Sequence, residues 1–415
     1  MNLQKECIYC GDTKSEDQFS DEHIWPDALG GDYLPKDVWR TKVCRSCNSM
    51  AGLFVDAAFI RSWIGKAEQS TAALDYLAGL NKPAALPLSY MGHLDGAWSS
   101  NTIADHWLGP CSATIIHLRP SDNDQDWSRA YAGGDPKNNR KKPGRAYLAL
   151  TSEEPFWVVV SLLSFAKHFK HAEKFVVNLV VEDTESELGD SKAHPLVQLL
   201  KKLKIRPGKP TPSESMDDFS IVNDVLEAAR RGEQIKTNVT ISQFADHRLL
   251  AKIALGLGFQ LFGGDFTITC YAKNLRKAFR EANVSKRLQL PLRGQGYFSG
   301  NPDAMLKQVL PWSGGWLLLL RVAKGQLGLH IVTPTAKTMT ILICDEPTLV
   351  SRLGPEYEDG QIWLTIPPAD MSVGPIPLPD YIAHQLNVSP HPELVALGSK
   401  RGDWRSLPQC RASEK

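Results

Sequence analysis

Four cysteines near the N-terminus have the spacing of two metal-binding turns. Cys7 and Cys10 form one Cys-x-x-Cys turn, and Cys44 and Cys47 form a second. Each turn places two sulfurs within bonding range of one ion, and four thiolates complete the closed tetrahedral coordination of Zn²⁺. The sequence therefore predicts one structural zinc site, which closes residues 11–43 into a loop and builds the fold without taking part in catalysis.

An acidic residue directly precedes a histidine inside this loop. His23 is suited to take a proton from water as the water attacks phosphorus. Glu22, its neighbour on a strand, points to the opposite side, where a carboxylate can hold a hard cation such as Mg²⁺. Asp56 lies roughly two helical turns beyond the second cysteine pair and can supply a second oxygen ligand. Asp21 and Ser49 are competitors for that second position.

These residues occur in the order of a known family motif. The segments that carry it are Cys7-Ile8-Tyr9-Cys10-Gly11, Glu22-His23-Ile24-Trp25-Pro26, Leu29-Gly30-Gly31, Val43-Cys44-Arg45-Ser46-Cys47-Asn48 and Asp56. The N-terminal sequence thereby resembles the HNH endonuclease family. More narrowly, it resembles the branch with a four-cysteine zinc site and a Glu-His-Ile-x-Pro…Leu-Gly-Gly signature.

The resemblance implies a ββα-metal finger, in which a β-hairpin carries His23 and a helix begins near Asn48. By this analogy His23 is the general base, and Asn48 braces the loop and orients it. Glu22 and Asp56 are the implied ligands of a catalytic cation. A pair of carboxylates favours Mg²⁺ or Mn²⁺ over Ni²⁺ or a catalytic Zn²⁺.

Basic side chains that can grip phosphates occur in two places. The candidate nucleic-acid-binding residues are Lys36, Arg40, Lys42 and Arg45 in the finger, and Lys137, Arg140, Lys141, Lys142 and Arg145 in a later loop. The later loop is equally well explained as a solvated hairpin tip. Contacts to phosphates carry no base information, so the finger alone is expected to cleave with little sequence preference. A net charge of +1, from 47 basic and 46 acidic side chains, excludes a globally polycationic binder.

The length of 415 residues predicts more than one domain. We expect the finger over residues 1–66, a middle α/β region over 67–206, an α+β region over 220–370 and a proline-rich, polar and poorly ordered tail over 371–415. The Pro- and Ser-rich segment 207–219 is predicted to be a linker. The expected fold class is α+β, with an N-terminal ββα-metal (HNH) zinc finger, a mixed α/β region and a C-terminal antiparallel sheet.

Hydrophobic spacing predicts the main elements beyond the finger. A capping box at 151–154 predicts a helix over 155–168, and an apolar face at helical spacing predicts another over 242–261. Short apolar runs between turn residues predict strands over 316–322, 328–332, 339–344 and 361–366.

The other four of the eight cysteines, Cys111, Cys270, Cys344 and Cys410, are scattered. This usage is typical of a reducing cytoplasm with one zinc site and argues against a disulfide framework. The chain has no apolar run long enough to span a bilayer and no signal-peptide core at its N-terminus. We therefore expect a cytoplasmic protein without a membrane partner.

The expected function is metal-dependent hydrolysis of nucleic-acid phosphodiester bonds, with DNA as the favoured substrate. The large C-terminal region is expected to target or regulate the finger through a regulatory protein or ligand. By resemblance, anti-phage defence is its expected setting. The main alternative is a catalytically inactive zinc-finger adaptor that binds nucleic acid or protein, which would need no Glu22-His23 pair. A restriction or homing enzyme would need a broader basic face than this near-neutral chain carries.

Overall fold

The computed structural model describes residues 4–80, 82–95, 101–121, 132, 144–179, 194–208, 216–239, 244–298 and 309–410. The chain divides into two compact units. Unit 1 comprises residues 1–60 and 242–401, and unit 2 comprises residues 61–241 and 402–415. The finger is therefore one part of a larger unit, whereas we had predicted a separate domain over residues 1–66. The reason is that its apolar face packs against residues 242–401.

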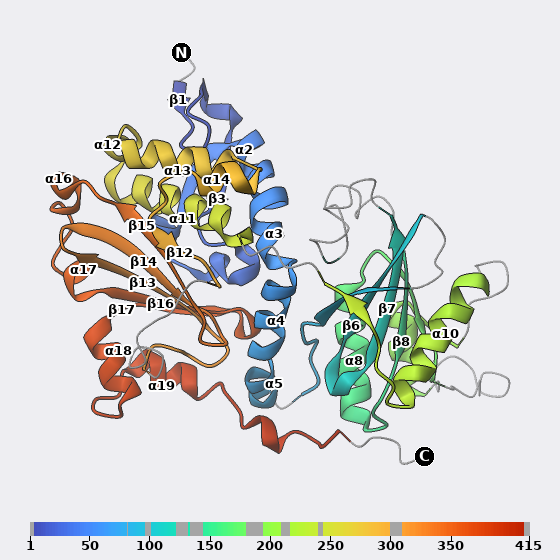
Figure 1. Ribbon diagram of the computed structural model, residues 1–415. Helices are drawn as coiled ribbons and strands as arrows, with labels where there is room; N and C mark the ends of the chain where they lie inside the picture. Colours follow the sequence, from blue (N-terminus) through green and yellow to red (C-terminus); the bar gives the residue numbers. More distant parts are fainter. Residues whose placement is uncertain are drawn as a thin grey trace. The chain divides into compact units, whose positions relative to one another are not determined.

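The finger consists of two small hairpins and a broken helix (Figure 1). Its elements are β1 (Gln4–Glu6), β2 (Thr13–Ser15), β3 (Phe19–His23), α1 (Lys36–Trp39), β4 (Arg40–Cys44), α2 (Arg45–Ala51), the π-helical turn η4 (Gly52–Asp56) and α3 (Ala57–Ile60). The strands pair as β1–β2 and β3–β4, both antiparallel. The helix begins at Arg45, a few residues before the start expected from the resemblance.

The returning half of unit 1 supplies helices and a six-stranded antiparallel sheet. The helices are α11 (Ala245–Phe262), α12 (Gly264–Thr267), α13 (Cys270–Arg280) and α14 (Val284–Leu288). The sheet has the order β12-β15-β14-β13-β16-β17, from β12 (Gly294–Gln295), β13 (Trp316–Ala323), β14 (Gln326–Val332), β15 (Thr338–Cys344), β16 (Gln361–Ile366) and β17 (Met371–Pro377). These findings confirm the predicted α+β class, with a small strand-and-helix region at the N-terminus and an antiparallel sheet near the C-terminus.

Helix α11 lies between the finger and the sheet. It contacts α1, β4, η4 and α3 of the finger, and β15 of the sheet. Aromatic rings join the same two parts: the centroids of Trp25 and Trp316 are 5.6 Å apart, and those of Trp39 and Trp363 are 5.5 Å apart. All four side chains are buried. The core of unit 1 is thus shared by segments that lie about 300 residues apart in the sequence.

The expected disordered tail is largely structured. Residues Met371–Pro377 form edge strand β17, and α18 (Leu378–Gln385) and α19 (Pro392–Gly398) follow it. Prolines are tolerated in β17 because an edge strand leaves part of its backbone unpaired. The Tyr381 hydroxyl, in a buried side chain, donates to the carbonyl of Leu310 at 2.8 Å.

Unit 2 is built on a seven-stranded mixed sheet, order β10-β9-β8-β7-β6-β5-β11. Its strands are β5 (Ser89–Leu94), β6 (Thr102–Leu108), β7 (Thr114–Pro120), β8 (Arg145–Ala149), β9 (Glu173–Val176), β10 (Ile205–Pro207) and β11 (Thr237–Asn238). Its helices include α4 (Trp63–Ala72), α5 (Leu74–Leu80), α8 (Pro155–His168), α9 (Pro195–Leu203) and α10 (Met216–Arg230). Among the described helices of both units, none combines the length and apolar character needed to cross a membrane.

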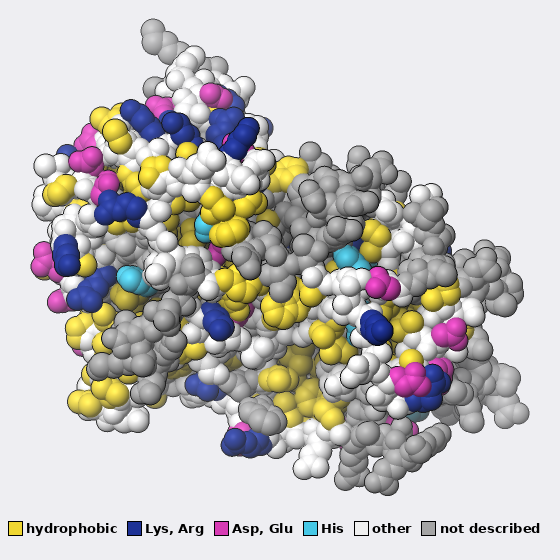
Figure 2. Space-filling view, in the orientation of Figure 1, with side chains coloured by type: hydrophobic (Ala, Val, Ile, Leu, Met, Phe, Trp, Pro, Cys, Tyr) yellow, Lys and Arg dark blue, Asp and Glu magenta, His cyan; other side chains and the backbone are white. Residues whose placement is uncertain are grey.

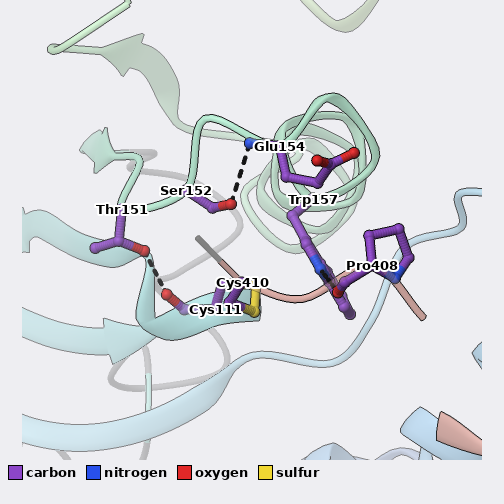
Figure 3. Close-up of a disulfide and its surroundings, with 7 residues drawn as sticks. All are labelled: Cys111, Thr151, Ser152, Glu154, Trp157, Pro408 and Cys410. Atoms are coloured by element: carbon purple, nitrogen blue, oxygen red, sulfur yellow. Dashed lines mark hydrogen bonds between the residues drawn. A yellow bond between two sulfur atoms is a disulfide. The ribbon is translucent and has the colours of Figure 1, made fainter. Parts of the chain in front are cut away.

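One disulfide bond is present in unit 2, between Cys111 and Cys410 (Figure 3). Beside it, the Trp157 indole donates to the carbonyl of Pro408 at 2.6 Å, and the Thr151 hydroxyl donates to the carbonyl of Cys111. Two of the four scattered cysteines are therefore paired, which differs from our expectation. Spacing in the sequence cannot indicate this pair, because its members are 299 residues apart.

Buried histidines predict a pH dependence of unit 2. Burial lowers the pKa of His106 and of His117 from 6.5 to about 4. The unfolded chain therefore binds more protons than the folded one between these values, and stability falls as pH drops from about 6.5 to about 4. A shift of this size corresponds to about 3 kcal/mol for each histidine. Among described atoms, neither ring nitrogen of His106 has a hydrogen-bond partner.

We therefore expect His106→Leu to lose less stability than wild type between pH 7 and pH 5 in urea unfolding of the zinc-loaded chain. Acid also weakens zinc–thiolate sites, so the comparison between variants isolates the histidine. His171→Leu is the matched control, since that side chain is exposed. An equal loss in His106→Leu and wild type would contradict the assignment.

The shared core predicts that the finger depends on the sheet. Trp316 contacts Trp25 and Phe59, both in the finger. Trp316→Ala should cost about 3–5 kcal/mol of unfolding free energy and should speed the removal of zinc by a chelator. Phe298→Ala, at a side chain 48% exposed in the same unit, should change stability by less than about 0.5 kcal/mol. Zinc loss at the wild-type rate from Trp316→Ala would show that the finger is independent.

Candidate active site

The four cysteines of the finger converge on one point. Their sulfur atoms all lie within 4.8 Å of one another, and the sulfurs of Cys10 and Cys44 are 4.0 Å apart. A tetrahedral zinc with Zn–S bonds of about 2.3 Å requires sulfurs about 3.8 Å apart. The Lys14 ammonium lies 3.5 Å from the Cys44 sulfur, where it offsets the negative charge of four thiolates. This cluster fits a structural metal such as zinc.

Hairpin β3–β4 carries the residues predicted to be reactive. In its register Glu22 lies opposite Thr41, and His23 lies opposite Arg40. Asn48 on α2 ties the helix to β3, because its amide nitrogen donates to the carbonyl of Asp21 at 2.7 Å and to the Ser20 hydroxyl at 2.9 Å. The brace acts on the residues directly before Glu22 and His23.

His23 lies on the open face of the hairpin, and Asp32 is its partner. The Nε2 atom of His23 is 2.8 Å from Oδ1 of Asp32, and the two side chains are 26% and 54% exposed. A hydrogen bond to a carboxylate requires the proton on Nε2, which leaves Nδ1 of a neutral ring as an acceptor. The bond from His23 holds the pKa of Asp32 below its ordinary value. Arg40 pairs with the same carboxylate oxygen.

The Leu-Gly-Gly turn brings Asp32 back to His23. Gly30 has φ +94°, a conformation that favours glycine. A Cβ on Gly31 would lie 2.0 Å from the Trp25 carbonyl oxygen, so only glycine fits there. The signature therefore has a structural cause, although the sequence analysis did not identify Asp32. Asp27 lies close as well, since ligand atoms of His23, Asp27 and Asp32 are within 4.8 Å of one another.

Glu22 lies on the opposite, buried face of β3, together with Asp56 at the end of η4. Both carboxylates contact one ammonium, that of Lys252 on α11. Its Nζ is 2.7 Å from Oε1 of Glu22, and 2.9 and 2.8 Å from Oδ1 and Oδ2 of Asp56. Glu22 and Lys252 are buried. Asp56 is thus on the same side as Glu22, whereas Asp21 and Ser49 are exposed.

On the buried face, burial and the neighbouring charges have opposite effects on each pKa. Burial raises the pKa of Glu22 and of Asp56, and Lys252 counters part of that effect. Although burial opposes the charged form of Lys252, the two carboxylates hold its pKa above the ordinary value. An ion that binds a substrate phosphate needs coordination positions open to solvent. A pair that is closed by a buried ammonium does not fit the catalytic Mg²⁺ or Mn²⁺ expected there.

The predicted phosphate contacts have different surroundings. Lys36, Lys42 and Arg45 are exposed on the finger, whereas Arg40 is half-buried and bound to Asp32. Arg145 begins β8 in unit 2. Lys137, Arg140, Lys141 and Lys142 lie outside the described residues.

Helix α13 adds basic residues that the sequence analysis missed. Arg276 donates to the carbonyl of Ile8 at 3.0 Å, and Arg280 donates to that of Cys10 at 3.4 Å, so α13 holds the first cysteine turn. Lys273 and Lys277 are exposed on the same helix. Figure 2 shows Lys and Arg side chains gathered where α12 and α13 lie. The basic residues of α13 recur at helical spacing in the sequence, at Lys273, Arg276, Lys277 and Arg280, and this pattern could have indicated them.

Removal of the second cysteine turn should empty the metal site. We expect Cys44→Ser/Cys47→Ser to lower bound zinc from about one ion per chain to none, with a loss of several kcal/mol of folding free energy. Elemental analysis and melting temperature measure both effects. Cys270→Ser, at an exposed cysteine, should keep the zinc. Full zinc in the double variant would place the metal elsewhere.

Comparison with known proteins agrees with this geometry. Residues 7–64 match a family model described as HNH endonuclease. No curated protein and no solved structure matches the chain. The matched residues include all four cysteines, the β3–β4 hairpin and its bracing Asn48. Residues 7–64 therefore match the HNH endonuclease family, and the cysteine cluster fits the zinc-binding branch of that family.

Proposed function

We propose that this chain is an endonuclease that hydrolyses nucleic-acid phosphodiester bonds, with DNA as the favoured substrate. The observation that carries the proposal is the solvent-accessible His23–Asp32 pair at the end of β3. It lies in a finger that matches the HNH endonuclease family and contains a cluster fit for structural zinc. A histidine oriented by a carboxylate is a recurrent arrangement for proton transfer.

In the proposed reaction, Nδ1 of His23 accepts a proton from the attacking water. The water oxygen bonds to phosphorus as the bond to the leaving oxygen breaks, and the leaving oxygen takes a proton from solvent. Asp32 holds the ring through Nε2 and stabilises the imidazolium that forms. Arg40 pairs with Asp32 and limits its movement. Asn48 acts one step farther away, through the backbone of β3. Glu22 and Asp56 hold no metal ion in this proposed reaction, since Lys252 occupies the position between them. Cleavage in the presence of EDTA distinguishes this reaction from one that requires the expected Mg²⁺ or Mn²⁺.

The exposed Lys36, Lys42 and Arg45 are the proposed phosphate contacts of the finger. Such contacts position a nucleic acid without reading its bases, which supports weak sequence preference. Lys273 and Lys277 on α13 extend the basic surface of unit 1.

Targeting or regulation belongs, in this proposal, to unit 2. Residues 242–401 complete the core that supports the finger, whereas unit 2 has its own sheet and its own apolar clusters. A protein partner or ligand of unit 2, and a role in anti-phage defence, are proposed from the resemblance alone.

The alternative function is a catalytically inactive adaptor that binds nucleic acid or protein. The ammonium of Lys252 between the two expected metal ligands favours this alternative. The solvent-accessible His23–Asp32 pair favours catalysis, because an adaptor has no use for an oriented base.

We expect His23→Ala to lower single-turnover cleavage about 10²- to 10⁴-fold, since it removes the general base. Bound zinc, melting temperature and nucleic-acid binding should remain at wild-type values. Asp32→Asn should keep the ring but weaken its orientation, with a loss of about 10²-fold. His171→Ala, at an exposed histidine of unit 2, is the control and should cleave normally. A folded His23→Ala protein that cuts at the wild-type rate would favour the adaptor.

A further inference from the structure

Three charged side chains from distant parts of the sequence meet inside unit 1. Glu22 comes from β3, Asp56 from the end of η4, and Lys252 from the middle of α11. Lys252 is 0% exposed, and Glu22 is 4% exposed. The ammonium donates to both oxygens of Asp56 at 2.9 and 2.8 Å, and Oε1 of Glu22 lies 2.7 Å from Nζ as an ion pair. The finger therefore places three carboxylate oxygens around the ammonium.

Burial makes this arrangement costly unless every charge is compensated. Removing an ion from water costs several kcal/mol even after relaxation, so an unpaired member would strongly destabilise the fold. Leu249, Leu250 and Ile253 are buried next to Lys252 in the sequence, so α11 carries its cation on an otherwise apolar stretch. A buried lysine in such a stretch would lower the stability of the fold unless the two carboxylates compensated its charge.

The three charges of this cluster do not sum to zero. Two carboxylates and one ammonium leave a net charge of about −1, whereas a divalent ion would neutralise the pair.

We propose that Lys252 is a built-in cation that takes the place of a divalent metal ion between Glu22 and Asp56. By fixing Glu22, it holds the end of β3 and therefore positions His23, the next residue on the strand. The inference deepens the proposed function, because it assigns the cation of that site to the protein itself. Residues 242–401 would then give the finger a positive charge, that of Lys252, in addition to an apolar surface.

The test is whether removal of the ammonium creates a metal site. Lys252→Met keeps a long unbranched side chain without charge. In zinc-loaded protein, titration with Mn²⁺ followed by electron paramagnetic resonance should detect one additional bound ion per chain in Lys252→Met relative to wild type. Saturating Mn²⁺ should raise the melting temperature of Lys252→Met by about 5 °C and leave that of wild type unchanged.

Two further variants make the result specific. Glu22→Gln/Asp56→Asn in the Lys252→Met background should abolish the added Mn²⁺ site, and it should fold without metal because no charge is left buried. Lys273→Met, at an exposed lysine of α13, should bind Mn²⁺ as wild type does. If Lys252→Met alone does not fold, recovery of folding in the triple variant supports the counter-ion role, and failure of both overturns it.

Two outcomes overturn the proposal directly. One is a Mn²⁺ ion bound by wild type and lost in Glu22→Gln/Asp56→Asn, which would show that metal displaces Lys252. The other is a folded Lys252→Met that neither gains Mn²⁺ nor changes in stability. The two readouts are Mn²⁺ binding and protein stability. They do not depend on whether the chain is an active nuclease, so this proposal can fail while the proposed function holds, and the reverse.

Discussion

The N-terminal finger carries more aromatic surface than a domain of its size can bury alone. Trp25, Trp39 and Phe59 are fully buried, and they reach that state against Trp316 and Trp363 of the C-terminal sheet. Domains of about 60 residues bury only about 60% of the surface that their unfolded chains expose. The zinc cluster fixes the local path of the finger, but the sheet and α11 supply its core. This requirement joins residues 1–60 and 242–401 into one unit.

The same packing explains how the two faces of β3 differ. Side chains alternate along a strand, so covering one face with α11 buries Glu22 and leaves His23 on the other face. The buried carboxylate then needs a cation nearby, and Lys252 provides it. The open face keeps a histidine with an exposed carboxylate partner, Asp32. One strand thus separates a charge that stabilises the fold from a base suited to chemistry.

Unit 2 also buries a charged side chain, and it pairs that charge with residues of its own sheet. Asp105 is fully buried in β6, where Arg119 and His93 each approach one of its oxygens at 2.7 Å. Although burial alone would raise it, the pKa of Asp105 lies well below its ordinary value because of the charge of Arg119 and the hydrogen bond with His93. Helices α8 and α9 supply apolar residues to one core cluster of unit 2, and α10 supplies them to another. Unit 2 therefore has a core of its own, and this independence supports the regulatory role proposed above.

Local patterns in the sequence were sufficient for several elements. Apolar spacing predicted α8 over Pro155–His168, although the predicted capping box does not form, because Glu154 is the N-cap without a side-chain capping bond. A short apolar run predicted β16 over Gln361–Ile366. The two Cys-x-x-Cys turns predicted a metal cluster, and the four sulfurs do converge. Strands β5 to β7 were missed because buried polar residues such as Asp105 and His117 interrupt their apolar pattern. Periodicity detects apolar faces, and it does not detect buried ion pairs.

The partners of the reactive residues were decided only by the tertiary structure. The sequence indicated His23, Glu22 and Asp56 as reactive or ligating, and these remain predictions for chemistry. It did not indicate Lys252, which is 196 residues from Asp56 and meets the two carboxylates only when α11 packs on the finger. Nor did it indicate Asp32, which a glycine turn returns to His23. The sequence by itself determined which side chains are present for chemistry and the local elements that carry them. Long-range packing determined which charges meet, because burial and pairing depend on contacts that no local spacing records.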